Sequence, residues 1–334
     1  MHSFTFLTAL SLLWLTCAGC QSIRTPTPAP GTLQKGPSPR VHLLATNDVV
    51  RVELDGQRFT EYHFKDVSRP FLYPLLGPGG VPLTRRWPME EFPGEEHDHP
   101  HHRSFWYSHG DVNGQDLWSE VAGAGRTVHQ QFLTQSSGAD KGVLSTRNEW
   151  RAKDGRVLGH DERTYTFYAA KGNQRIIDFA VKIFATDQEL VLGDTKEGTL
   201  ALRVAESMRV TQPKNQPGAG RLVNSRGQVN GDVWGQRAEW ADYSGPVDGT
   251  TYGIAIMDHP SNPRHPTWWH ARDYGLFAAN PFGLHDFEKQ PKGAGDFKVP
   301  AGGSVTFRYR VVLHLGNAET AQMAAQYEDF RQDR

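Results

Sequence analysis

Histidines are concentrated in one stretch of this chain, HDHPHHRSFWYSHGDVNGQDLW at residues 97–118. Imidazole is the side chain whose ordinary pKa lies nearest neutrality, so a histidine cluster can move protons, contact a ligand or bind a metal. The stretch therefore predicts a chemical site, with His99 and His102 as acid/base candidates. Five of the fifteen histidines of the chain fall within it: His97, His99, His101, His102 and His109.

The same stretch allows a metal site as an alternative. Two or three imidazoles with one carboxylate would suit zinc or non-haem iron. Against a regular arrangement of ligands, Pro100 interrupts the segment, and the chain contains no HExxH motif. A divalent metal is thus possible, although no cofactor is predicted firmly. The candidate ligands are His97, His99, His101 and His102.

A second concentration, DHPSNPRHPTWWHARDYGLFAANPFG, covers residues 258–283. Its four prolines would stiffen the chain and hold side chains in place without regular secondary structure, as a pre-organised site requires. The alternative is a structured cover over one end of the fold. The segment supplies His270 as an acid/base candidate and six candidates for ligand binding: His259, His265, Trp268, Arg272, Tyr274 and Asn280.

A third candidate segment, LGDTKEGTLALRVAES at residues 192–207, places a carboxylate beside a lysine at the start of a strand. Such a pair can act as acid and base when a pocket moves their pKa values apart, so Glu197 is predicted to oppose the imidazoles. Lys196, Arg203 and Glu206 are candidate ligand contacts. Alternatively, Arg203 lies on the wet face of a strand whose other face is apolar.

Aromatic and polar residues between these segments suggest a sugar as the ligand. Trp106 and Trp268 could stack on a sugar ring, or they could belong to the core. Arg103 and Arg272 are predicted to hold oxyanions or hydroxyl groups. His109 and Asn113 complete the candidate ligand-binding set, with a tight turn as the alternative reading of the segment around Asn113.

Most of the chain that must position these residues consists of short segments of alternating polarity. In SVTFRYRVVLHLG, residues 304–316, every second side chain is apolar, which is typical of a half-buried antiparallel strand. Many such segments predict an all-β fold, a large antiparallel β-sandwich. Two long loops, 68–125 and 258–296, carry the histidine clusters, and a C-terminal helix is predicted in residues 317–332, capped by Asn317.

The amino terminus resembles an export signal. The apolar run from Phe4 to Trp14 is too short for a membrane span, so residues 1–19 are predicted to be a cleaved signal peptide. The segment ending in Cys20 is similar to a bacterial lipoprotein signal, which implies acylation of Cys20 and a location on the periplasmic or outer side of a membrane. A secreted soluble protein is the alternative. Residues 20–40 would form a flexible tether, and 41–334 a single domain.

Composition excludes several classes of function. The net charge of −1 offers no basic surface for nucleic acid. No P-loop, GxGxxG or GxSxG motif occurs, so a nucleotide cofactor is not expected. After cleavage Cys20 would be the only cysteine, which excludes a disulfide framework.

Several motifs together resemble a bacterial domain family labelled "methane oxygenase PmoA", over residues Val49 to Leu315. They are RPFLYPLLGPGG, HDHPHHRSFWYSHGDVNGQDLW, DTKEGTLALRVAE and NPRHPTWWHARDYGLFAANPFG. The label itself does not suit a chain without a membrane-spanning segment. More distantly, FKVPAGGSVTFRYRVVLHLG and the loops rich in His, Arg and Glu resemble galactose mutarotase-like β-supersandwich proteins. That resemblance implies a sugar bound on a concave face, with a histidine as acid and a carboxylate as base.

These observations predict an exported protein that binds and processes a carbohydrate. The chemistry would be proton transfer next to a carbonyl or anomeric centre, as in an epimerase, a lyase or a hydrolase. The prediction requires that the segments 97–109 and 259–272 meet Glu197 around one cavity. The alternatives are a metal-dependent enzyme and a non-catalytic sugar-binding lipoprotein.

Overall fold

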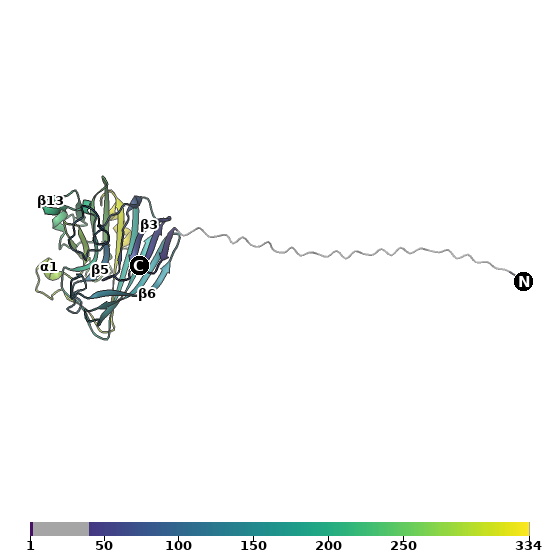
Figure 1. The fold of residues 1–334 in the computed structure, drawn as a ribbon, viewed down its shortest axis with the longest axis horizontal. Helices are drawn as coiled ribbons and strands as arrows, with labels where there is room; N and C mark the ends of the chain where they lie inside the picture. The colour runs from purple at the N-terminus through teal and green to yellow at the C-terminus, as the bar shows by residue number, and fades with distance from the viewer. Residues whose placement is uncertain (3–39, 334) are drawn as a thin grey trace. The chain divides into compact units, whose positions relative to one another are not determined.

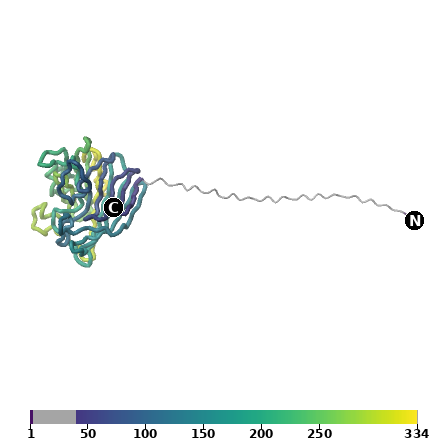
Figure 2. Tube along the Cα trace, viewed as in Figure 1, coloured from purple at the N-terminus to yellow at the C-terminus, as the bar shows by residue number. Residues whose placement is uncertain are grey.

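A computed structural model describes residues 1–2 and 40–333, and two large antiparallel sheets dominate it (Figure 1). The predicted signal peptide, Cys20 and nearly all of the predicted tether fall outside the described residues. Within the described part of the chain, no helix is long and apolar enough to cross a membrane. Figure 2 traces the path of the same chain from residue 40 to the C-terminal end.

The first sheet, called the front sheet here, has eight strands that all pair antiparallel. It carries the candidate site. In spatial order its strands are β1 (Val41–Ala45), β2 (Val49–Leu54), β3 (Gln57–His63), β4 (Phe71–Leu72), β5 (Phe105–His109), β11 (Gly198–Arg203), β18 (Leu276–Asn280) and β17 (Trp268–Ala271).

The second sheet, called the back sheet, also has eight antiparallel strands. Its strands are in general longer than those of the front sheet. In spatial order they are β14 (Arg221–Asn224), β15 (Trp240–Val247), β16 (Thr250–Asp258), β20 (Ser304–Leu315), β9 (Gln174–Ala185), β8 (Val157–Tyr168), β7 (Lys141–Arg151) and β6 (Arg126–Ser136).

Small elements complete the fold. Two short two-stranded sheets lie outside the large ones, and the helices of the described residues are few and short. These elements are β10 (Leu190–Leu192) with β19 (Phe297–Val299), β12 (Thr211–Gln212) with β13 (Gln216–Pro217), the 3-10 turns η1 (Pro78–Gly80), η2 (Glu206–Met208), η3 (Pro213–Asn215) and η4 (Asn230–Val233), and the helices α1 (Leu284–Glu288) and α2 (Met323–Phe330).

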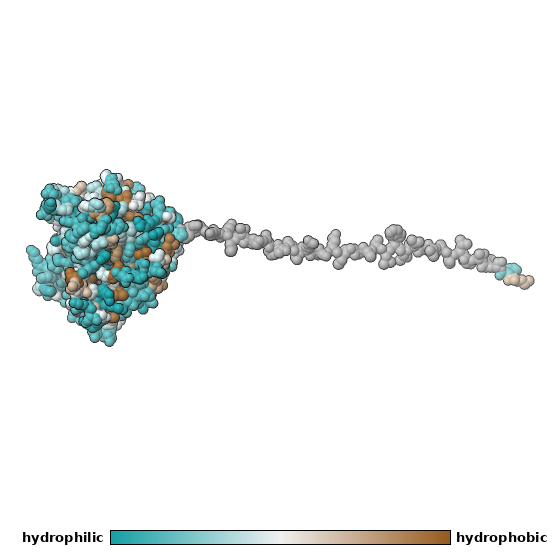
Figure 3. Space-filling view, viewed as in Figure 1, coloured by the Kyte–Doolittle hydropathy of each residue, from teal (hydrophilic) through white to brown (hydrophobic). Residues whose placement is uncertain are grey.

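The main core lies between the two sheets. On β20, Phe307, Val311 and Leu313 are completely buried in it, as the alternation of residues 304–316 predicts. On β11, Leu200 and Leu202 enter the same core from the front sheet. The predicted all-β antiparallel sandwich is therefore confirmed. The face shown in Figure 3 is mostly hydrophilic, with small apolar patches between the polar side chains.

The front sheet also buries its other face. Ala201 and Arg203 point away from the main core because side chains alternate along β11, yet both are completely buried. Ala201 packs in a second apolar cluster whose largest members are Trp106 and Trp118. Arg203 thus does not lie on a wet face. The loop between β5 and β6 contributes Trp118 and covers this face of the sheet.

Three segments differ from the sequence-based expectation. The C-terminal helix begins at Met323 instead of close to Asn317. Asn317 caps a turn of its own by accepting the Thr320 N–H at 3.0 Å, and the left-handed backbone of Gln322 (φ 56°) separates this turn from the helix. Neither predicted long loop is one loop: the segment 68–125 contains β4, η1 and β5, and the segment 258–296 contains β17, β18 and α1. Every residue of β17 and β18 is buried, so those strands show no alternation that could be recognised.

Candidate active site

A cavity of about 480 Å³ lies over the outer face of the front sheet and brings the two histidine-rich stretches together. It is lined from the loop before β5, the β5–β6 connection, the loop before β11, strand β17 and the turn after it. Segments that are far apart in the sequence therefore meet around one space. The lining residues are His99, His101, His102, Gly110, Asp116, Trp118, Ser119, Lys196, Glu197, His270, Arg272 and Tyr274.

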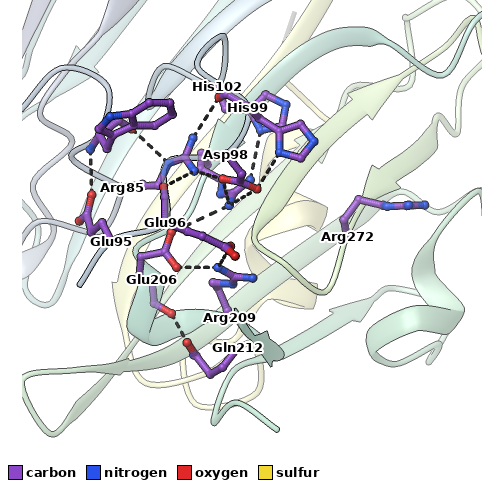
Figure 4. Close-up of polar contacts among 12 residues, drawn as sticks. Arg85, Glu95, Glu96, Asp98, His99, His102, Glu206, Arg209, Gln212 and Arg272 are labelled. Atoms are coloured by element: carbon purple, nitrogen blue, oxygen red, sulfur yellow. Dashed lines mark hydrogen bonds and ion pairs between the residues drawn. The ribbon is translucent and has the colours of Figure 1, made fainter. Parts of the chain in front are cut away.

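Asp98 holds the histidine loop in place through buried ion pairs. Its carboxylate accepts hydrogen bonds from Nη2 of Arg203 at 2.9 and 3.1 Å and also pairs with Arg85 (Figure 4). Both guanidinium groups are fully buried. Burial alone would raise the pKa of Asp98, but the hydrogen bond from His99 and the two guanidinium groups hold it well below its ordinary value. Asp98 is thus a permanent negative charge.

The negative charge of Asp98 determines which ring nitrogen of His99 carries a proton. Nδ1 of His99 lies 2.6 Å from Oδ2 of Asp98, and an ionised carboxylate can only accept, so Nδ1 carries the proton. The Nε2 atom of His99 then has a lone pair for taking up a proton. An Asp98–His99 pair of this kind orients the ring and fixes its tautomer.

His102 is held in the opposite tautomer. Nη1 of Arg203 lies 3.2 Å from its Nδ1, and because arginine can only donate, Nδ1 of His102 is unprotonated. The neutral ring therefore carries its proton on Nε2. Desolvation, with the positive charge of Arg203, holds the pKa of His102 well below the ordinary histidine value. His102 is suited to donate a hydrogen bond from Nε2, whereas His99 is suited to exchange a proton.

The rings of this loop form a stack. His99 lies parallel to Tyr274, with ring centroids 5.1 Å apart, and parallel to His102 at 4.7 Å. His102 in turn stacks on Trp106 at 5.4 Å. Trp106 is only 1% exposed and lies beneath the stack, so it does not line the cavity. Tyr274 and Trp118 line the cavity instead, and because Trp118 is also only 1% exposed, Tyr274 is the main aromatic surface.

Glu197 is placed by the backbone around it. Asn280 donates from Nδ2 to the carbonyl oxygens of Thr195 and Lys196 at 3.0 and 2.8 Å, which fixes the loop before β11. The Gly110 N–H donates to the carbonyl oxygen of Glu197 at 2.6 Å, and a Cβ at Gly110 would lie 2.6 Å from Cβ of Glu197, so only glycine fits. Nζ of Lys196 lies 2.5 Å from Oε1 of Glu197. Asn280 is thus a support for the site.

His270 and Arg272 close the cavity from β17 and the turn after it. His270 is 3% exposed, and burial, with the nearby Arg272, lowers its pKa to about 3. The guanidinium of Arg272 lies 5.8 Å from the ring centroid of Tyr274 and 5.5 Å from that of Trp234. Among residues 40–333, no carboxylate is within ion-pair distance of the Arg272 guanidinium.

Four other sequence candidates near the front sheet have structural partners outside the cavity. Arg103 forms two 2.7 Å hydrogen bonds with Glu120. His109 is buried and bonds through Nε2 to the Gly193 carbonyl oxygen at 2.8 Å. The side chains of Asn113 and Glu206 are also occupied. Asn113 ties its loop to strand β10 by donating to the Glu189 carbonyl oxygen and accepting the Val191 N–H, and Glu206 pairs with Arg209 at 2.7 Å.

Candidates in the first part of the second stretch lie away from the cavity. His259 bonds to Ser261 and to the backbone of Asp333, near helix α2. His265 pairs with the buried Asp258 at 2.7 Å. The Trp268 indole donates to Glu288 at 2.8 Å. These groups hold chain segments together, and none of them lines the cavity.

The candidate metal ligands do not converge. Within the part of the chain that the structure describes, no three His, Cys, Asp or Glu residues are placed to hold a metal ion. His97 stacks on Trp87 at 4.9 Å, away from the other rings. His101 meets His99 and His102 edge to face, with ring centroids 5.8 and 4.5 Å apart. The histidine loop is thus arranged by aromatic packing.

Sequence reasoning missed several residues of the site. Asp98 and Arg85 are the important ones, because they set the state of His99. The only local signal was the Asp–His pair in the HDHPHH stretch. Asp116, which caps Trp118 and Ser119 by accepting their N–H groups at 2.7 and 3.0 Å, was visible only as a turn former.

We expect the buried histidines to make stability dependent on pH. Burial lowers the pKa of His270 to about 3 and that of His109 to about 4, whereas an unfolded histidine titrates near 6.5. Below about pH 6.5 the unfolded chain therefore binds more protons, and the free energy of unfolding falls by up to about 1.4 kcal/mol per pH unit for each ring. Urea unfolding between about pH 7 and pH 5 would measure this slope.

The His270→Asn variant should show a shallower slope than the wild type. His42→Asn, on the edge strand β1, is the matched control and should keep the wild-type slope. Equal slopes for the wild type and His270→Asn would contradict the assignment of a neutral, buried His270.

The sequence and the structure were compared with those of known proteins. An alpha-galactosidase from Lactobacillus brevis is similar over 84% of this chain and 40% of its own, with 9% sequence identity and a TM-score of 0.39. The chain thus spans less than half the length of that protein. No curated protein matches the sequence. The label methane oxygenase PmoA stays a prediction. The family described as "Family of unknown function (DUF6807)" matches residues 49–328, and the chain belongs to this family.

Proposed function

We propose that this protein binds a carbohydrate in the cavity over the front sheet and catalyses proton transfer on it. The observation that carries the proposal is the placement of His99, His102 and Glu197 around one cavity, with Asp98 fixing the first of them. Imidazole and carboxylate groups that share a pocket are the usual pair for general acid and base work near neutral pH.

The roles follow from the hydrogen bonds. Glu197 is the base that removes a proton next to a carbonyl or anomeric centre, and His99 returns or removes a proton on the opposite side through Nε2. His102 donates from Nε2 to the oxygen on which negative charge develops, as a neutral imidazole can. His270 is buried and uncharged at neutral pH, and it contributes to the cavity wall.

A sugar suits the cavity because aromatic and polar groups alternate around it. Tyr274 supplies a partly exposed aromatic ring, while Lys196, Asp116 and Arg272 supply donors and acceptors for hydroxyl groups. If the predicted export signal is correct, the substrate is a glycan found outside the cytoplasm.

Incubation of the purified protein with a panel of oxidised and unoxidised disaccharides in D₂O tests the proposal. Epimerisation or elimination next to a carbonyl should leave deuterium in the recovered sugar or change its mass, and hydrolysis in H₂¹⁸O should label the new hydroxyl group. Mass spectrometry detects the products of all three reactions. Binding of a sugar with no isotope incorporation and no product would contradict catalysis and leave a sugar-binding protein.

A further inference from the structure

We propose that the site continues past Arg272 into a second sugar subsite, and that the ligand is an acidic glycan at least two rings long. This inference rests on the proposed function, because it names the substrate class of the same site. A second cavity of about 470 Å³ lies beside the first and shares Arg272 and Tyr274 with it. Gln212, Asn215 and Trp234 are among its other lining residues.

The size of the two cavities argues for more than one ring. Each has a volume within the range of about 300–1,000 Å³ that is common for small-molecule sites. Since both are bounded by the same Arg272 and Tyr274 side chains, a ligand that fills one cavity can extend into the other along this boundary.

The second cavity offers the same kind of surface as the first. Trp234 is half-buried, and its Nε1 has no hydrogen-bond partner in the described part of the chain. Phe287 supports the indole edge to face at a centroid distance of 5.5 Å. The supported indole, next to the polar side chains of Gln212 and Asn215, matches a hydroxylated ring, and its buried Nε1 takes no part in this contact.

Arg272 gives the boundary its charge. Its guanidinium lies over the rings of both Trp234 and Tyr274, which leaves the N–H edge for a ligand. Arg209, which lines the same second cavity, is already paired with Glu96 and Glu206 at 2.7 Å each. Figure 4 shows Arg272 apart from that ion-pair cluster.

A charged edge of this kind selects an oxyanion. Guanidinium binds carboxylate or sulfate through two parallel hydrogen bonds, and such charge-assisted bonds are roughly twice as strong as neutral ones. Asp273 and Glu96 also line the second cavity, but Glu96 is paired with Arg209 and Asp273 acts on Arg272 only from beyond ion-pair distance. Among residues 40 to 333, no carboxylate forms an ion pair with Arg272, so the ligand is inferred to bring one. The acidic group therefore sits at the boundary, between the ring in the first cavity and the ring in the second.

Calorimetric titration of the full chain tests this inference. The probes are mono- and disaccharides of galacturonic, glucuronic and mannuronic acid, their uncharged methyl esters, and sulfated galactan disaccharides. We expect at least one acidic disaccharide to bind about tenfold more tightly than its ester. Tighter binding of the uronate or of the sulfated sugar identifies the source of the oxyanion.

Two variants separate the parts of the proposal. Arg272→Gln should abolish the preference for the acid over the ester, and Arg272→Lys should keep part of it, because the charge remains without the planar fork. Trp234→Ala should weaken disaccharide binding about tenfold while monosaccharide binding is kept. Arg156→Gln, in the exposed turn between β7 and β8, is the control. It should change neither the preference for the acid nor the affinity for the disaccharide.

The outcomes distinguish this inference from the proposed function. If Trp234→Ala weakens the binding of mono- and disaccharides equally, or if Arg272→Gln keeps the preference for the acid over the ester, the second subsite is overturned even if turnover is observed. Tight, Arg272-dependent binding of an acidic disaccharide without turnover would support the subsite and contradict the catalytic role. Failure of every acidic sugar to bind would overturn the inference, while turnover of a neutral disaccharide in the D₂O panel would still support the proposed function.

Discussion

Replacing Glu197 with glutamine is expected to lower kcat by about 10²–10⁴-fold, the usual contribution of a positioned general base. Glutamine keeps the size of the side chain, and the backbone contact with Gly110 that places residue 197 is unchanged. Substrate affinity should therefore change much less than kcat. Steady-state kinetics with the best substrate of the disaccharide panel would measure both quantities.

The matched control for this variant is Glu189→Gln. Glu189 is an exposed carboxylate that pairs with Lys298 at 3.4 Å outside the cavity, and its loss should leave kcat within about twofold of the wild type, as for surface substitutions in general. Full activity of Glu197→Gln would remove the carboxylate from the mechanism and leave His99 to act without an opposing base.

Replacing Arg203 with methionine is expected to destabilise the protein by about 3–5 kcal/mol, the cost of breaking a buried ion pair from one side. Arg203 is completely buried and donates to both Asp98 and His102. Its removal leaves the charge of Asp98 with Arg85 and His99 as its only partners among the described residues. The midpoint of urea unfolding would report the loss.

Arg203 acts on the chemistry through His102, so a second measurement separates positioning from stability. Without the guanidinium, the pKa of His102 should rise, and its proton should no longer be confined to Nε2. Nitrogen NMR of the histidine rings detects this change of tautomer. Arg203→Lys should recover part of the stability but less of the tautomer preference. An unchanged His102 spectrum in Arg203→Met would limit Arg203 to a structural role.

The parts of the fold that were predictable from sequence are those where burial alternates. Residues 304–316 show one apolar and one polar face, and they form β20 as predicted. Strands β17 and β18 could not be recognised, because loops and the second apolar cluster bury them on both faces. Proline and histidine in the surrounding segment then favoured a loop interpretation.

The site was predictable where residue type alone carries the signal. The histidine stretch, Glu197, His270 and Arg272 are brought together in the structure, although their roles stay predictions. Partners could not be predicted, since Arg203 meets Asp98 across more than one hundred positions of sequence. For the same reason, Trp234, from the turn η4, went unnoticed beside Arg272.

Strand β11 has a consequence for how this family can diverge. Leu200 and Leu202 face the sandwich interior, while Ala201 and Arg203 face the layer beneath the cavity. Inherited changes at Leu200 or Leu202 therefore act on folding, whereas a change at Arg203 acts both on folding and on the histidine loop that it supports. Because one buried strand serves both purposes, new specificities in this family are expected to arise in the loops that line the cavity and not in this strand.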